Sequence, residues 1–167
     1  MRFLLAFAAL LATPALAADT AFLVANPAAP PSALPSVDRA CTMDVAARQA
    51  SQTTSDRADE LNVRGDASSA MGLWRTAVLL DACNGSSWAN LGTALVSQGN
   101  AADGLVAAQA AIRLDRGNVT AWIAAARALE AQGQWKGALK AWQEVLVISP
   151  ENFVAEDGLR RAARASL

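Results

Sequence analysis

The chain has 167 residues, with 14 basic and 15 acidic side chains, two cysteines and no histidine. The lack of histidine excludes Ser-His-Asp and Cys-His catalysis and imidazole metal ligands, and two cysteines cannot form a four-thiolate zinc site. A net charge of -1 argues against a nucleic-acid-binding face, which must be basic. We therefore expect no catalytic site, no metal, no cofactor and no nucleic-acid partner.

Residues 1–17 have the layout of a secretory signal peptide. A positively charged start is followed by an apolar run from Phe3 to Ala12 and by the small-residue cleavage site Ala15-Leu16-Ala17. The run is too short to span a bilayer, which takes about 20 residues. Cleavage after Ala17 is therefore favoured over a retained membrane anchor. We expect a protein exported across the inner membrane to the periplasm and not inserted in the membrane.

Residues 18–40 are rich in proline and alanine. Closely spaced prolines disfavour helix and favour an extended, polyproline-II-like chain. The segment is therefore interpreted as a linker, and a plain spacer is favoured over a proline-rich recognition motif. The folded domain is expected at 41–167.

From about residue 51 onward, the chain repeats itself with a period of 34 residues. Trp88 and Trp122 are one period apart, and Gly65, Gly99 and Gly133 follow the same step. A period of 34 with helical spacing inside it is typical of a helix–turn–helix solenoid. Each of these glycines lies between two helical stretches, where a tight turn after a helix end favours glycine.

The pattern predicts seven helices, and the residues after the first two glycines, Asp66 and Asn100, are expected to be N-caps. Ser149-Pro150 is expected to begin the last helix, with proline in its first turn. This helix would be a polar cap that keeps the solenoid soluble. The expected ranges are 44–64, 67–81, 86–98, 101–114, 119–132, 135–148 and 151–166.

These residues resemble the tetratricopeptide repeat (TPR) family. Trp88-x2-Leu91-Gly92-x2-Leu95 is similar to the helix-A signature W-x2-L-G-x2-Y, and Ala138-x3-Trp142 with Pro150 is similar to the A-x3-F…P half. The resemblance implies an all-α, TPR-like solenoid of antiparallel helix pairs. Its repeats would occupy 51–84, 85–118 and 119–152, and a capping helix would occupy 153–167.

The resemblance also implies a concave groove lined by the first helix of each repeat. Some family members hold a peptide's terminal carboxylate there with Lys, Asn and Arg. Asn90, Arg127 and Arg161 could act similarly, through an amide and two guanidinium forks. The alternative is a solvated face with scattered charges. The candidate groove residues are Asn62, Asn90, Thr93, Arg127, Glu130 and Arg161.

Cys41 and Cys83 predict a disulfide, because an even cysteine count in an exported chain indicates pairing. The helix ends that bear them lie on one side of an antiparallel hairpin. A straight helix from Asp44 to Arg64 would carry Cys41 past Cys83 at about 1.5 Å per residue. The bridge therefore implies a bend near 51–55 or a reversal of the chain within 37–43. The alternative is two buried free thiols.

Four tryptophans at repeat positions, Trp74, Trp88, Trp122 and Trp142, are interpreted as core, without polar partners at matching spacing, and Trp135 as partly exposed. The function expected from the resemblance is a non-catalytic adaptor or assembly factor of the bacterial envelope. It would bind a protein or peptide, as a monomer or within a hetero-complex. The alternative is a structural subunit of a larger envelope complex, for example in cytochrome c maturation, pilus or secretion assembly, or outer-membrane assembly.

Overall fold

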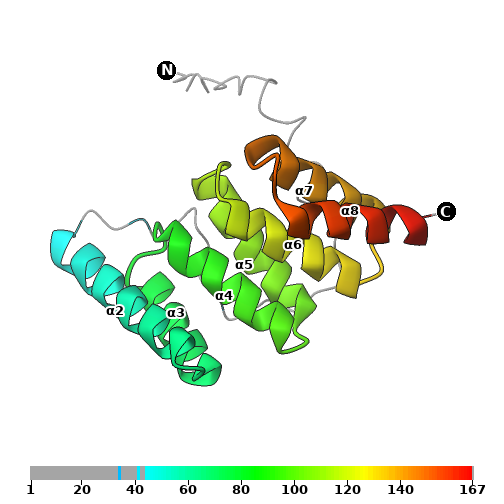
Figure 1. Cartoon of the computed structure of the whole chain (residues 1–167). Coiled ribbons are helices and arrows are strands. Elements are labelled where there is room, and N and C mark those ends of the chain that lie inside the picture. The colour runs from blue at the N-terminus through cyan, green and yellow to red at the C-terminus, as the bar shows by residue number, and fades with distance from the viewer. Residues whose placement is uncertain (1–33, 35–40, 42–43, 167) are drawn as a thin grey trace, which may run out of the picture.

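The computed structural model describes residues 34, 41 and 44–166; the predicted signal peptide and all of the linker except Leu34 lie outside this part. Within it, the chain forms seven α-helices and no strand. They pair as antiparallel hairpins that stack in chain order, with the last helix at the open end (Figure 1). The helices are α2 (Val45–Val63), α3 (Ala67–Leu80), α4 (Gly85–Ser97), α5 (Ala101–Leu114), α6 (Val119–Ala131), α7 (Trp135–Ile148) and α8 (Phe153–Ala165).

The turns inside the hairpins confirm the roles predicted for the glycines. Gly65, Gly99 and Gly133 have φ of 88°, 84° and 70°, the left-handed region that a glycine adopts without steric cost. Asp66 and Asn100 then cap α3 and α5, as expected: each side chain accepts a hydrogen bond from a backbone N–H in the first helical turn. The helix borders therefore follow from local chemistry that recurs with the repeat.

The start of the last helix differs from the prediction. Pro150 lies in the turn before α8, and the helix begins at Phe153. Asn152 is the cap, because its side-chain oxygen accepts from the N–H of Ala155 at 3.1 Å. Asn84 and Asn118 cap α4 and α6 in the same way. The cap thus keeps the 34-residue period, and this periodic asparagine outweighs the helix-starting preference of proline.

Helix α2 runs without a break through 51–55, so the first of the two alternatives, a bend there, is wrong. The other alternative, a reversal of the chain within 37–43, lies mostly outside the described residues. Buried Ser51 donates to the carbonyl of Ala77 at 2.8 Å, which holds the middle of α2 against α3. Cys41 precedes the first residue of α2, Val45, by four positions, and the disulfide places it beside Cys83 in the loop after α3.

The core consists mainly of alanines, with leucines, two valines, one isoleucine and three tryptophans. Trp88 and Trp142 are fully buried and Trp74 nearly so, while Trp122 is half-buried and packs against the same core. Alanine at most other inner positions lets neighbouring helices approach closely. At Gly104, an added Cβ would lie 2.5 Å from a methyl group of Val96, so the contact between α4 and α5 requires glycine. The alanine excess of the composition is thus the filling of tightly stacked hairpins.

The Asp66 cap predicts a pH dependence of stability. Hydrogen bonds from Ser69, first from its hydroxyl and then from its backbone N–H, and from the Ser68 hydroxyl lower the pKa of Asp66 below its ordinary value of 3.8. A depressed pKa means that the stabilisation is complete above the unfolded-state pKa and is lost as the pH falls through the folded-state pKa. Asp66→Asn should therefore flatten the acid side of a pH–stability curve measured by thermal unfolding.

Asparagine fits the cap, because Asn100 occupies the equivalent position one repeat later and accepts from the N–H of Asp103. Stability of the variant near neutral pH therefore serves as the control. An Asp66→Asn variant whose stability falls with acid as steeply as that of the parent protein would contradict the role assigned to this carboxylate.

Candidate functional site

One row of residues runs along the first helices of the repeats. Asp59, Thr93, Arg127 and Arg161 are separated by 34 residues each and lie on α2, α4, α6 and α8. Equivalent positions of stacked repeats face the same way. The surface that carries this row, called the A-helix face below, therefore changes from acidic at α2 through uncharged α4 to basic at α6 and α8. Five of the six candidate groove residues belong to the row or bond to a member of it.

At the α2 end of the A-helix face, one carboxylate joins three helices. Asp59 Oδ1 accepts from the indole Nε1 of Trp74 on α3 at 2.9 Å and from the amide Nδ2 of Asn90 on α4 at 3.0 Å. The Asn90 amide, predicted to serve a ligand, is therefore already bonded to the protein's own carboxylate.

The same arrangement recurs at the α8 end. Glu130 Oε1 accepts from Trp142 Nε1 at 2.9 Å, and Glu130 Oε2 lies 3.3 Å from Arg161 Nη2. Arg161 also forms an ion pair with Asp157 one turn earlier on α8. The Glu130 side chain is only 15% exposed and that of Arg161 is 49% exposed. The Arg161 guanidinium is thus held between two carboxylates of the same chain.

The remaining candidate residues form fewer side-chain bonds to other helices. The hydroxyl of Thr93 donates to the carbonyl of Ala89 in its own helix at 3.1 Å, and Asn62 is exposed. Arg127 is exposed and has no ion pair or side-chain hydrogen bond within the described residues. Of the three groups proposed to clamp a carboxylate, Arg127 alone is thus available without breaking an internal bond.

The bonds from tryptophan to carboxylate are the feature that sequence reasoning missed. Trp74 and Trp142 were interpreted as core residues, because the sequence showed no polar partners at the spacing that a cofactor site would need. Each nevertheless donates its indole N–H to an acidic side chain on the preceding helix. A signal was present: both tryptophans occupy the same repeat position, and an acidic residue lies on the first helix of each of these two repeats. The middle repeat has Ala108 at this position and no charged residue on α4, and it forms no such bond.

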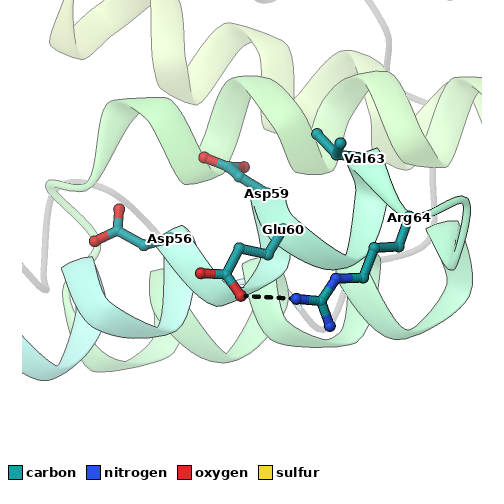
Figure 2. A pocket seen from close by; sticks show the side chains of 5 residues that line it. All are labelled: Asp56, Asp59, Glu60, Val63 and Arg64. Carbon is teal, nitrogen blue, oxygen red and sulfur yellow. Dashed lines mark ion pairs between the residues drawn. The ribbon is translucent and has the colours of Figure 1, made fainter.

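A wide, open depression lies on α2 beside this face (Figure 2). It is lined by Asp56, Asp59, Glu60, Val63 and Arg64. Glu60 and Arg64 form an exposed ion pair at 3.8 Å, and Val63 is 87% exposed. Figure 2 shows Asp59 turned toward the neighbouring helix while Asp56 points away from it. No cluster of three or more metal-ligating side chains occurs in the described part of the chain. Three of the five residues that line the depression are acidic, so it is called the acidic patch below.

Cys41 and Cys83 form a disulfide with a Cα–Cα distance of 5.0 Å. The bridge fastens residue 41 to the loop between α3 and α4. Leu34, in the segment interpreted as a plain spacer, is half-buried and packs against the core. None of the described helices is both long and apolar enough to cross a membrane.

Comparison with known proteins identifies the fold. Residues 119–152 match the family model of the tetratricopeptide repeat. The first TPR of Spaghetti (RPAP3) bound to the HSP90 peptide SRMEEVD has a TM-score of 0.68 at 21% identity, covering 71% of this chain and 94% of that one. The second TPR domain of human RPAP3, in complex with the HSP70 peptide SGPTIEEVD, has a TM-score of 0.65 at 20% identity, covering 70% and 98%.

A mutant O-GlcNAc transferase of Thermobaculum terrenum is also similar, with a TM-score of 0.65 at 20% identity. It covers 72% of this chain but only 23% of the transferase chain, so the likeness concerns a small part of that enzyme. No curated protein sequence matches. The described part of the chain is therefore an all-α solenoid of the tetratricopeptide repeat fold, and residues 119–152 also match this repeat in sequence.

Proposed function

We propose that this protein is a non-catalytic, exported adaptor of the bacterial envelope that binds a peptide or an extended segment of a partner protein on its A-helix face. The observation that carries the proposal is Arg127. It stands exposed in the centre of the row, between uncharged Thr93 and the paired Arg161. A free guanidinium on a preformed helical surface can take a carboxylate through two parallel hydrogen bonds.

Two further observations support the proposal. The two RPAP3 domains described above share this fold, and each has a bound peptide in its own structure. The Cys41–Cys83 bridge suits an oxidising compartment such as the periplasm. The presence of this disulfide agrees with the export that residues 1–17, which resemble a signal peptide, lead us to expect. A peptide that contacts little of the protein beyond this row would bind reversibly, and an adaptor needs reversible binding.

Replacing Arg127 tests the proposal. A displayed library of random dodecapeptides with free C-termini is selected on the full mature chain, and the enriched peptides are measured by fluorescence anisotropy. Arg127→Ala should weaken binding by at least tenfold, because a charge-assisted hydrogen bond contributes about 1.5–3 kcal/mol. Arg113→Ala removes the same charge from α5, where the arginine is exposed, and should leave binding unchanged. Failure to enrich any peptide, or equal binding by Arg127→Ala, would sink the proposal.

The alternative of a stable subunit has one observation in its favour. Val147 and Phe153 flank the loop between α7 and α8 and are 75% and 78% exposed. Two large apolar side chains at one edge favour a protein contact there. Constant recovery of one partner with the native protein, together with failure of the peptide selection, would favour this function over the adaptor.

A further inference from the structure

We propose that Glu130 is a specificity residue of the A-helix face: by occupying Arg161, it makes this face reject peptides rich in carboxylates and accept those that bring a single carboxylate to Arg127. The inference rests on the proposed function and deepens it, because it names the chemistry of the peptide. It rests on two similar sets of contacts described above. In each, one carboxylate accepts from a tryptophan indole and also binds a second donor, Asn90 at Asp59 and Arg161 at Glu130.

Glu130 is fixed in place from behind. Its Oε1 accepts from the indole of Trp142 at 2.9 Å, and Trp142 is fully buried. The carboxylate therefore cannot swing away when another anion approaches Arg161. Its second oxygen, Oε2, faces Arg161 at 3.3 Å. Glu130 therefore occupies Arg161 in the way that the carboxylate of a bound peptide would.

The other side of Arg161 is also occupied. Asp157 lies one helical turn before Arg161 on the same exposed face of α8 and pairs with it. An incoming peptide carboxylate would have to displace one of these two groups and would be repelled by the other. At the opposite end of the row, Asp59, which lines the acidic patch, binds the Asn90 amide in the same manner and adds a further negative charge.

The A-helix face thus contains an attractive group and repulsive ones, and specificity commonly requires both. Arg127 is the attractive group. Glu130, Asp157 and Asp59 are the repulsive groups, because each would meet an acidic side chain with like charge. The peptide that fits has one carboxylate for Arg127 and neutral or basic residues on either side of it.

The test compares Glu130→Gln with the parent protein. Glutamine keeps an oxygen that accepts from Trp142 but loses the charge that holds Arg161. The probe is the peptide SRMEEVD with a fluorophore on its N-terminus, in two forms, with a free C-terminus and with a C-terminal amide. Glu144→Gln is the matched control. Glu144 is exposed on α7, and the substitution removes the same charge away from the row.

Glu130→Gln should bind the free-acid peptide about twofold to fivefold more tightly than the parent protein, as expected for breaking one partly exposed ion pair. The preference for the free acid over the amide should rise as well, a change that a purely structural effect would not produce. Glu144→Gln should match the parent protein in both measurements. Equal binding curves for the two variants and the parent, at whatever affinity, would overturn the inference.

The outcome separates this inference from the proposed function. If the parent protein enriches peptides that need Arg127 but Glu130→Gln leaves selectivity unchanged, the adaptor function stands and Glu130 has no such role. If the library yields nothing while Glu130→Gln gains affinity for SRMEEVD, the role of Glu130 stands and the adaptor proposal fails. Thermal unfolding of each variant verifies that the fold is intact.

Discussion

Gly158→Ala is expected to destabilise the protein by about 2 kcal/mol and to loosen α8 from the solenoid. An added Cβ would lie 2.2 Å from Cε2 and 2.6 Å from Cδ2 of Trp142. The indole is fully buried, so displacing it disturbs the packing of the core around it. Alanine gains about 1 kcal/mol in helix propensity over glycine, but overpacking of a well-filled core costs about 1–3 kcal/mol and occasionally more. At 2.2 Å, we expect a cost at or above the top of that range.

Urea unfolding, followed by tryptophan fluorescence, measures this loss. The same clash would shift the Trp142 indole away from Glu130, so Gly158→Ala should also free Arg161 from one partner. Gly72→Ala is the matched control, because Gly72 is exposed on α3 and an added Cβ would meet no atom within 4 Å. It should stabilise the protein by up to about 1 kcal/mol. If both variants are more stable than the parent protein, α8 does not pack on Trp142 as described.

Reduction of the Cys41–Cys83 disulfide is expected to lower the free energy of unfolding by up to about 4 kcal/mol. The bridge joins residues that are 42 positions apart. In the chain-entropy model, opening a loop of about 43 residues restores this much freedom to the unfolded chain. Cys41 is exposed and Cys83 half-buried, so a reductant can reach the bond. A loss of this size would be a large part of the roughly 5–15 kcal/mol typical of a domain.

The measurement is urea unfolding of the mature protein with and without a phosphine reductant. The double variant Cys41→Ser, Cys83→Ser should match the reduced protein and should not respond to the reductant. Alkylation followed by mass spectrometry counts free thiols under native conditions. Two alkylated cysteines in the untreated mature protein would contradict the bridge.

These two effects concern opposite ends of the solenoid, where it has the fewest neighbours. Each repeat of a solenoid contacts only the adjacent ones, so its first and last elements are covered on one side only. Helix α2 is stabilised there by the Ser51–Ala77 hydrogen bond and by the covalent bridge nearby. Helix α8 is stabilised by the close seating of Gly158 on Trp142 and by the Glu130–Arg161 pair. The middle repeat relies on alanine and glycine contacts.

The sequence by itself determined the repeat, the helices and most of their borders. A glycine with positive φ and a capping Asp or Asn are local requirements, so their spacing can be read without knowing the fold. The start of α8 was predicted wrongly because proline was weighted above Asn152, although that asparagine continues the period of Asn84 and Asn118. The bend in α2, one of the two alternatives for the bridge, was wrong. It assumed positions of Cys41 and Cys83 along the hairpin, and only the packing of α2 on α3 sets those positions.

Only the tertiary structure decided which groups on the A-helix face are free. Arg127 and Arg161 occupy the same repeat position and look alike in the sequence. Within the part of the chain that the structure describes, Arg127 has no ion pair, while Arg161 is held by Glu130 and Asp157. The tryptophan–carboxylate bonds likewise join residues on different helices. Such contacts depend on the distance and angle between neighbouring helices, which side-chain packing sets and which a periodic pattern does not contain. The row of candidate residues was therefore predictable, and its distribution of free and occupied charges was not.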